Sequence, residues 1–337
     1  MKRGLPSISV LIPTLNSAST LRDCLRAITG QRYPKDLVEI IVADGGSRDE
    51  TVAIAREFGA VVVSNPLVTG EAGKAVAFKA ATNELIALID SDNIIVGDDW
   101  FDRMVAAFED PAVVGAEPMY FVSTPADNTI NRYCAIFGVN DPLCLFIGNY
   151  DKYSAVSGRW TGYHLRTRDV GDYVTISLDT ERLPTIGANG TMYRREALQP
   201  FVTSYLMDID VPVLIAKTQT GLEFAKVRVG IRHLFCSDVG AFARKQRRRI
   251  RDFFSPAQRE EDRAYGWRNA LLMGVIRFVC SCVTVIPLLY QSCLAYNRSK
   301  DRAAFFHPVA CMITLAVYGS NFMFARGRPL SRSAWKQ

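Results

Sequence analysis

The sequence predicts an α/β fold with an open, mainly parallel sheet, followed by apolar helices toward the C-terminus. Over the first 120 residues, short apolar runs alternate with segments in which apolar residues recur every three or four positions. The first pattern is typical of buried strands and the second of helices that pack on a sheet. Two long apolar segments near the end of the chain predict a separate helical part.

The elements of the first part follow one another as strand and helix in turn. One face of the first helix, Ser19–Ile28, carries Leu21, Cys24, Leu25 and Ile28, and Ser47 with Glu50 predicts a capped start of the second helix. Such alternation favours parallel strands with right-handed crossovers. The expected strands are Ile8–Thr14, Val38–Asp44, Ala60–Ser64, Leu85–Asp90 and Val113–Phe121, and the expected helices are Ser19–Ile28, Ser47–Phe58, Gly73–Thr82 and Asp99–Phe108.

The pattern weakens between Val122 and Pro184, where aromatic residues are frequent and no period is visible. This segment is either an insertion with a small core of its own or a surface for a bulky apolar substrate. After it, the stretch "LPTIGANGTMYRREAL" predicts a helix that begins near Arg194, and Glu223–Phe235 predicts a further strand.

Charge is distributed unevenly along the chain. The net charge is +6, but from Ala241 onward there are 17 Lys and Arg against 5 Asp and Glu, which leaves 23 against 29 before that point. A basic C-terminal part indicates an anionic partner, either nucleic acid or a membrane surface. No nucleic-acid reading module is visible, so we expect membrane lipids and no nucleic acid.

The start of the chain and the cysteines bear on the cellular compartment. Residues 1–16 hold two basic residues but no continuous apolar run that ends in small residues, so we expect no cleaved secretory signal and a catalytic part that faces the cytoplasm. The 8 cysteines form no C-x-x-C pair, which favours reduced packing residues over a zinc site or a disulfide framework.

The two apolar segments, Ala270–Tyr290 and Ala303–Ala325, are close to the roughly 20 residues that a membrane-spanning helix needs. Arg277 lies inside the first, and Pro287 is expected to kink it. Six basic residues between Arg244 and Arg251 precede the two apolar segments, and they predict a helix that lies on the surface of an anionic membrane. A spanning hairpin, a shallow hairpin at the interface and two buried helices of a soluble protein all remain open.

Carboxylates mark the ends of two expected strands. "LIALIDSDN" ends in Asp90 and Asp92, whose side chains point the same way if the chain stays extended, and could face one divalent cation. Asp44 ends an earlier strand before Gly45 and Gly46, and could accept hydrogen bonds from a base or ribose. Because these ends share one sheet edge with Thr14, we expect a pocket there for a nucleotide whose phosphates bind a divalent ion.

The order and spacing of five motifs resemble glycosyltransferase family 2, whose catalytic domain has the GT-A fold. The likeness covers about Ile8 to His233. It implies that Asp44 recognises the nucleoside, that Asp90 supports the ribose or metal, and that Asp92 binds Mg²⁺ or Mn²⁺ on the diphosphate. The motifs are "SVLIPTLN", "VADGGSRDET", "GEAGKAVAFKAAT", "LIDSDN" and "GANGTMYRREAL".

The resemblance also implies the other binding residues. Pro13, Thr14, Gly73 and Lys74 would line the donor pocket, and His233, after the "VGIRH" strand, would reach a diphosphate oxygen beside the metal. A structural hydrogen bond remains open for His233.

Asp208 matches the family's catalytic base, although "MDID" has Met207 where the family usually has Glu. A sugar hydroxyl needs such a base, whereas a phosphate acceptor is already an anionic nucleophile. With a phosphate acceptor, Asp208 would only orient metal or donor, and a solvated loop position also remains open. Asn189 of the Gly-x-Asn motif, with Arg194 and Arg195, is assigned to acceptor binding; the two arginines could equally form a solvated face.

Together these observations predict a metal-dependent, inverting hexosyltransferase that moves a sugar from a nucleotide diphosphate to a membrane lipid, with polyprenyl phosphate as the first choice of acceptor. The tail resembles that of polyprenyl-phosphate glycosyltransferases, and we expect the cell membrane as location. The alternatives are transfer to a sugar hydroxyl of a lipid-linked oligosaccharide or polysaccharide, and a non-catalytic nucleotide-sugar binder. The expected domains are a catalytic domain at 1–240 (a nucleotide half at 1–120 and an acceptor half at 121–240), an interfacial segment at 241–268 and an apolar hairpin with a basic tail at 269–337.

Overall fold

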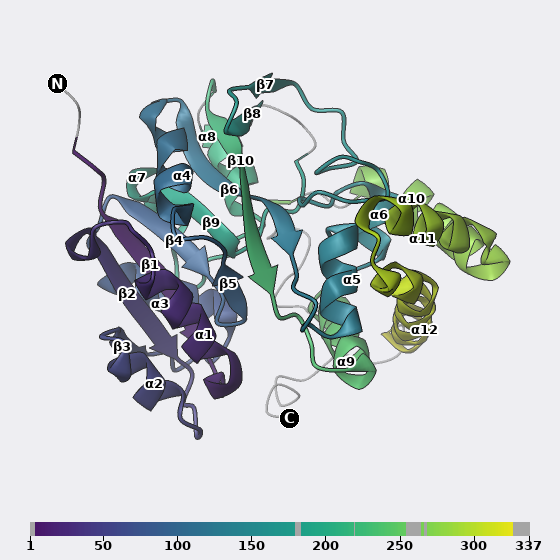
Figure 1. Ribbon diagram of the computed structural model, residues 1–337, viewed down its shortest axis with the longest axis horizontal. Coiled ribbons are helices and arrows are strands. Elements are labelled where there is room, and N and C mark those ends of the chain that lie inside the picture. The colour runs from purple at the N-terminus through teal and green to yellow at the C-terminus, as the bar shows by residue number, and fades with distance from the viewer. Residues whose placement is uncertain (1–3, 179–182, 219, 254–263, 266–267, 326–337) are drawn as a thin grey trace. The chain divides into compact units, whose positions relative to one another are not determined.

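The computed structural model describes residues 4–178, 183–218, 220–253, 264–265 and 268–325 (Figure 1). The chain forms two compact units: a sheet unit of Met1–Val122 with Tyr163–Leu234, and a helical unit of Ser123–Gly162 with Phe235–Gln337. The first part of the aromatic-rich segment, Ser123–Gly162, thus belongs with the C-terminal helices, and its remainder belongs to the sheet unit. Within the first part, Tyr133 and Phe137 share a buried core with Phe242.

The sheet unit is built on one ten-stranded sheet. Its order is β3-β2-β1-β4-β9-β6-β10-β8-β7, and β5 pairs with β10. The strands are β1 (Ile8–Thr14), β2 (Val38–Asp44), β3 (Val61–Ser64), β4 (Leu85–Ile89), β5 (Asn93–Ile95), β6 (Val113–Val122), β7 (Thr167–Asp169), β8 (Tyr173–Ser177), β9 (Asn189–Arg194) and β10 (Glu223–His233).

Strand direction changes across this sheet. The neighbours β3, β2, β1 and β4 pair in parallel, as the alternating sequence predicts. Strand β9 enters from the second half of the chain and pairs antiparallel with both β4 and β6. All five residues of β4 are buried, which explains its continuous apolar sequence. The mixed, mostly parallel sheet with flanking helices confirms the predicted fold class.

The predicted first helix is confirmed, and its buried residues are the four named from the sequence: Leu21, Cys24, Leu25 and Ile28. The second begins later than predicted, at Thr51, because the Ser47 hydroxyl bonds to Asp44 and does not cap the helix. The helices of this unit are α1 (Ala18–Thr29), α2 (Thr51–Glu57), α3 (Gly70–Ala80), α4 (Trp100–Ala106), α7 (Arg195–Leu198) and α8 (Val211–Thr218), with short 3₁₀ turns η1 (Lys35–Leu37), η2 (Ala107–Glu109) and η3 (Gln199–Phe201).

The helical unit surrounds a core of aromatic and small apolar side chains. Phe242 packs edge-on against Phe235 and Phe306, and Tyr133 lies against Phe306 in the same way. The elements are α5 (Thr129–Phe137), α6 (Leu143–Ile147), α9 (Val239–Phe253), α10 (Arg268–Thr284), α11 (Ile286–Ser299), η6 (Arg302–Phe306) and α12 (His307–Ala325). Part of the expected interfacial segment and the basic tail, residues 254–263, 266–267 and 326–337, lie outside the described residues.

The first apolar segment is two helices, because the chain breaks at Val285, two residues before the expected kink at Pro287. In the part of the chain that the structure describes, one helix, Arg302–Asn321, is long and apolar enough to cross a membrane. Leu272–Thr284 and Ile286–Ser299 reach that length only together, and they are bent by 94°.

A buried ion pair lies in the centre of the sheet. Lys226 of β10 is the register partner of Glu117 of β6, and their side chains meet at 2.5 Å with both side chains at 0% exposure. Lys226 also contacts the carbonyl oxygen of Pro118 at 3.4 Å. Each charge therefore depends on the other for compensation, since water does not reach the pair.

We predict that Lys226→Met lowers the free energy of unfolding by about 3–5 kcal/mol, because it leaves the Glu117 carboxylate buried without its counter-charge. The double variant Glu117→Leu, Lys226→Met should lose much less, since no buried charge remains. Urea unfolding followed by circular dichroism measures both, with Arg22→Met at the exposed Arg22–Glu57 pair as the control. A double variant as unstable as the single one would contradict this account.

Candidate functional site

The carboxyl ends of β1 and β2 meet in register, which brings two of the predicted residues together. Thr14 pairs with Asp44, and the Thr14 hydroxyl donates to Asp44 Oδ1 at 3.2 Å. Both residues are buried. The two strand ends therefore share one sheet edge, as the predicted pocket requires.

The Asp44 carboxylate organises the loop that follows β2. Its Oδ2 accepts from the backbone amides of Gly46 and Ser47, each at 2.9 Å, and its Oδ1 accepts from the Ser47 hydroxyl at 2.5 Å. Gly46 has a φ of +90°, which a residue with a side chain rarely adopts. With Thr14, these donors fill the roughly four lone-pair positions of a carboxylate. A nucleoside that bonds to Asp44 would replace one of them, and the Thr14 bond is the longest.

Gly73 permits close packing of α3 against the end of β1. A Cβ atom on Gly73 would lie 2.8 Å from the Pro13 Cβ and 3.0 Å from Asn65 Nδ2. The helix starts with Thr69 as its N-cap, whose side chain accepts from the amide of Ala72. The start of α3 therefore lies directly beside Pro13. Backbone amides at a helix start attract negatively charged groups.

Asn65 is a buried residue of this site that the sequence analysis missed. It is 1% exposed, its Nδ2 donates to the Thr69 carbonyl at 2.9 Å, and its Oδ1 has no hydrogen-bond partner within the described chain. A buried amide oxygen usually has a partner, which makes this atom a candidate ligand contact. Its position directly after β3, like that of Asp44 at the end of β2, was the available signal.

Lys74 and Asp208 form an ion pair that joins distant parts of the chain. Lys74 Nζ lies 2.9 Å from Asp208 Oδ2, and the side chains are 5% and 18% exposed. Asp208 Oδ1 accepts from the amide of Ile209 at 3.0 Å. Burial alone would lower the pKa of Lys74, but the charges of Asp208 and Asp90 raise it above the usual value, so the ammonium group stays charged.

Asp90 lies in the same charged cluster. Burial raises the pKa of its carboxyl from 3.8 to about 6; Lys74 opposes this effect, and the negative charges of Asp92 and Asp208 add to it. The chain turns here, because the amide of Asn93 donates to the Asp90 carbonyl at 2.9 Å. The expectation of an extended chain through Asp92 is therefore wrong, although both carboxylates remain at the end of β4.

Asp92 and His233 lie together because β5 pairs with β10. His233 is the register partner of Asn93, and the amide of Leu234 donates to the Asp92 carbonyl at 2.8 Å. His233 Nε2 is 3.5 Å from Asp92 Oδ2, and its ring lies against Phe121 at 5.5 Å. The two residues predicted to hold the metal are thus neighbours, brought together by backbone pairing.

The donor set fits a divalent cation that is shared with a ligand. Within the described residues there is no group of three or more His, Cys, Asp or Glu side chains that could hold a metal ion alone. The Asp92 carboxylate and the His233 imidazole would leave most positions of an octahedral metal coordination sphere for other ligands. Mg²⁺ typically binds in this way, through one or two protein ligands plus substrate phosphates and water.

The Gly-x-Asn motif lies beside the ion pair. A Cβ atom on Gly187 would be 3.7 Å from Asp208 Oδ2 and 3.8 Å from Asn189 Nδ2, so both polar groups flank this glycine. Asn189 pairs with Ile89 at the end of β4, across an irregularity in the ladder. The Thr191 hydroxyl closes the turn by donating to the Gly187 carbonyl.

Arg194 and Arg195 do not lie with these residues. The predicted helix start near Arg194 is confirmed, because α7 begins at Arg195. Residues 189–194 before it form strand β9, and Arg194 pairs with Leu85 at the opposite end of β4 from Asn189. Arg194 donates to the carbonyls of Phe108, Asp110 and Val113. The Arg195 guanidinium stacks on Phe78 at 5.0 Å. These contacts stabilise the fold, and they do not support the expected role of the two arginines at the acceptor.

Comparison with known families agrees with this arrangement. The family described as "Glycosyl transferase family 2" matches residues 9–200. The chain belongs to glycosyltransferase family 2. The family predicted from the sequence is confirmed. The family match ends before Asp208 and His233, so it does not cover the whole site.

Relatives within curated proteins are distant and partial. The glycosyltransferase AglE of Haloferax volcanii is 30% identical over 119 residues, which is 34% of this chain and 39% of that protein. The probable glycosyltransferase YdaM of Bacillus subtilis is 27% identical over 175 residues, 49% of this chain and 39% of that protein. The chain thus spans about two fifths of the length of these family 2 relatives.

Among solved structures, the mannosyltransferase PcManGT of Pyrobaculum calidifontis, in complex with GDP-Man and Mn²⁺, has the same fold. Its TM-score is 0.51 at 17% identity, over 93% of this chain and 87% of that one. This likeness confirms the predicted GT-A fold for the family 2 chain described here.

We predict that Gly190→Ala destabilises the protein more than Gly171→Ala. Both glycines have positive φ, +79° and +96°, which costs a substituted residue about 1–2 kcal/mol. A Cβ on Gly190 would also meet Ile231 at 2.9 Å, Pro118 and Trp100, whereas nothing lies within 4 Å at Gly171. Overpacking adds about 1–3 kcal/mol. Thermal and urea unfolding of the two variants measure the difference, and equal losses would refute tight packing behind Asn189.

Proposed function

We propose that the protein is a metal-dependent, inverting glycosyltransferase that uses a nucleotide-diphosphate sugar and acts on a lipid-linked acceptor. The observation that carries this is the convergence of Lys74, Asp208 and Asp90 with the neighbours Asp92 and His233 at the carboxyl end of β4. Such a group of opposite charges at a strand-end edge suits a charged ligand that also brings a cation.

Asp92 and His233 would hold Mg²⁺ or Mn²⁺ together with oxygens of the donor diphosphate. Bound there, the ion would supply positive charge where negative charge develops on the leaving diphosphate. The start of α3, next to Pro13 and Gly73, would offer backbone amides to the same phosphates. Asp44 would orient the nucleoside through the hydrogen bond now made by Thr14. PcManGT, whose structure holds GDP-Man and Mn²⁺, supports the combination of a nucleotide sugar with a divalent ion.

Two kinds of acceptor fit the position of Asp208. Polyprenyl phosphate is our first choice, since a phosphate monoester attacks without giving up a proton at neutral pH. The ion pair with Lys74 supports this choice, because one carboxylate oxygen already binds an ammonium group. Asp208 would then keep Lys74 in place, and Lys74 would attract the anionic acceptor or donor.

The alternative acceptor is a sugar hydroxyl on a lipid-linked saccharide. It is favoured by a relative from Methanococcus voltae, named as a transferase onto dolichyl N-acetyl-α-D-glucosaminyl phosphate, which is 40% identical over 50 residues. Here Asp208 Oδ1 would take the hydroxyl proton as the new bond forms. Asn189, beside Asp208, would bind the acceptor in either case.

We propose the cell membrane as the location, with the catalytic domain facing the cytoplasm. One helix of membrane-spanning length and the exposed apolar residues of the helical unit support membrane association. A non-catalytic nucleotide-sugar binder would show donor binding without transfer to any lipid. Measurement of transfer therefore separates this reading from an enzyme.

The first experiment measures transfer of label from a panel of nucleotide sugars into organic-extractable lipid. With polyprenyl phosphate and Mn²⁺, we expect the wild type to make labelled lipid and Asp208→Asn to keep a rate within about tenfold, since no base is needed. A lipid-linked sugar acceptor should instead lose roughly 10²–10⁴-fold in the same variant.

The exposed surface carboxylate Asp23 supplies the matched control, Asp23→Asn, which should leave both rates unchanged. Donor binding without transfer to either class of acceptor would overturn the proposed function.

A second prediction concerns the metal. Asp92→Asn should raise the Mn²⁺ concentration for half-maximal transfer by at least about tenfold, because it removes a charged ligand. Binding of Mn²⁺ in the presence of nucleoside diphosphate, followed by electron paramagnetic resonance, should weaken in parallel. Asp98→Asn, at an exposed residue that pairs with Arg32, is the control. An unchanged Mn²⁺ dependence would remove Asp92 from the proposed site.

A further inference from the structure

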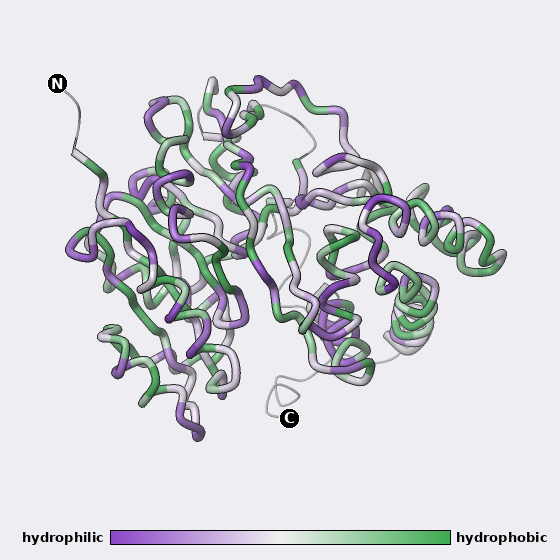
Figure 2. The backbone as a smooth tube through the Cα atoms, viewed as in Figure 1, coloured by the Kyte–Doolittle hydropathy of each residue, from purple (hydrophilic) through white to green (hydrophobic). Residues whose placement is uncertain are grey.

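The helices α10 and α11 expose large apolar side chains to solvent. Leu272 and Val283 of α10 are 69% and 75% exposed, and Ile286 and Tyr290 of α11 are 74% and 65% exposed. Figure 2 shows hydrophobic colours along these helices. A contiguous apolar surface on two successive helices exceeds what isolated surface residues account for, and typically marks an interaction site.

The shape of this helix pair does not suit a membrane crossing. At 17 and 14 residues, α10 and α11 are about 25 and 21 Å long, whereas the hydrocarbon core is about 30 Å thick. The 94° bend at Val285 prevents them from adding their lengths. A pair of this shape would enter an apolar phase at the bend and return.

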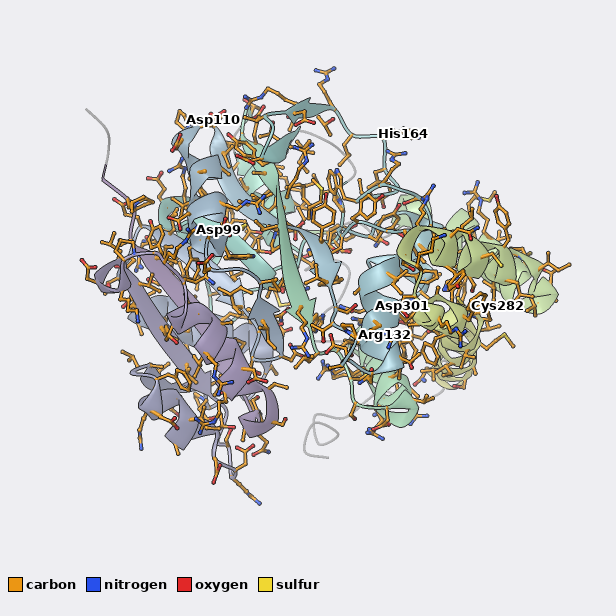
Figure 3. All side chains as sticks on the ribbon, viewed as in Figure 1. Asp99, Asp110, Arg132, His164, Cys282 and Asp301 are labelled. Carbon is orange, nitrogen blue, oxygen red and sulfur yellow. The ribbon has the colours of Figure 1, made fainter. Side chains whose placement is uncertain are left out.

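The end of α11 is fastened to polar parts of the same unit. Arg298 donates to the carbonyls of Ala155 and Val156, at 2.8 and 3.1 Å. Arg132 of α5 forms a two-point ion pair with Asp301, at 2.9 and 2.5 Å, and both residues are labelled in Figure 3. The turn between α11 and η6 must therefore lie on the same side of any membrane as α5.

Within the described residues, the helix of spanning length, η6 with most of α12 (Arg302–Asn321), packs with one side against the helical unit, and 39% of its apolar window is buried. His307 at its start stacks on Phe137 of α5 at 4.4 Å between the rings. Farther along, the Tyr318 hydroxyl donates to Asp141 at 2.5 Å and to Gln246 of α9 at 3.2 Å. The apolar sequence of α12 thus serves the core of this unit, in contact with α5 and α9.

Helix α9 carries four of its five arginines on the face away from that core, whereas Arg249 lies over the Phe235 ring at 5.2 Å. Phe242 and Gln246 are buried, whereas Arg244, Arg247, Arg248 and Arg251 are exposed and share one helix face. If α12 crossed a bilayer, α9, which is packed against it, would also enter the bilayer. Each arginine placed at the bilayer centre costs about 3 kcal/mol. Because the apolar face of α9 around Phe242 packs on this unit, its exposed arginines are the part of the described helix that can face anionic lipid.

We propose that the helical unit docks on one leaflet of an anionic bilayer, with the bend between α10 and α11 inserted as a wedge and no helix crossing. Arg277 of α10 is exposed within the apolar surface, and Arg298 and Lys300 are exposed near the end of α11. Apolar residues flanked by cations match the interface of an anionic membrane. A second copy of the chain fits less well, because a symmetric pair would place these cations opposite one another.

This inference deepens the proposed function, in which the acceptor is a membrane lipid, but its test is independent of catalysis. Lys300→Cys and Arg251→Cys each add one exposed thiol to a Cys280→Ser, Cys293→Ser background, which removes the two cysteines exposed in the structure. Sealed membrane vesicles are treated with a membrane-impermeant maleimide, before and after permeabilisation. The background protein without an added cysteine reports labelling of the remaining thiols.

One-leaflet docking predicts that Lys300→Cys and Arg251→Cys are labelled from the same side of the vesicle. A spanning hairpin places Lys300, between the two apolar segments, on the opposite side from Arg251. Labelling of the two positions from opposite sides would overturn the proposal, whichever side carries the catalytic domain.

Binding to vesicles tests the wedge itself. Val283→Glu, Ile286→Glu should reduce binding to phosphatidylglycerol-containing vesicles by roughly tenfold per side chain, since each exposed apolar group no longer enters lipid. Val61→Glu, at an exposed valine of β3, is the matched control and should bind like the wild type. Unchanged thermal unfolding and nucleotide binding show that the variants are folded.

If the double variant binds vesicles like the wild type and a dimer becomes a monomer instead, the apolar surface is a protein interface and the proposal fails. Loss of vesicle binding with intact transfer to a soluble short-chain acceptor would support the wedge and leave the proposed chemistry standing. Loss of transfer with intact vesicle binding would point to the chemistry alone.

Discussion

The ion pair between Lys74 and Asp208 links the two halves of the sheet unit. Lys74 lies on α3, close to the strands that end at Thr14 and Asp44, whereas Asp208 follows β9, 134 residues later in the chain. A backbone hydrogen bond from Leu206 to the carbonyl of Glu71 fixes the same junction. Because the pair is largely shielded from water, loss of either charge leaves the other poorly compensated. Two contacts therefore set the relative placement of the expected donor and acceptor residues, and the backbone hydrogen bond remains in Asp208→Asn.

The sequence predicted what depends on local periodicity. The strands Ile8–Thr14 and Val38–Asp44 and the buried face of α1 follow from patterns of two and of three to four residues. The convergence of Thr14 and Asp44 also follows, since parallel strands share an edge. His233 lies beside Asp92 because β5 pairs with β10. Periodicity does not predict this contact, and His233 was predicted from the family resemblance alone.

Other features depend on contacts that a local pattern does not contain. The run "GTMYRREAL" has helix-forming residues at its end, but tertiary pairing with β4 and β6 makes its first half a strand and takes Arg194 to the far edge. The apolar composition of α12 is compatible with a membrane span and with a core helix, and no local pattern contains its contacts with α5 and α9. Asn65 was missed because its strand is short and its sequence, "SNP", is typical of a turn.

The charges of the site make a cation part of its chemistry. Asp90, Asp92 and Asp208 lie close enough to influence one another, while Lys74 is the lysine in their midst. The raised pKa of Asp90, about 6, reflects burial first and then repulsion from its neighbours, which Lys74 only partly offsets. A diphosphate brings further negative charge to the same edge. Its binding would add like-charge repulsion within a partly buried cluster, where charges are poorly screened. A divalent ion held by Asp92 and His233 would offset that repulsion, so we expect donor and metal to bind cooperatively, each more weakly without the other.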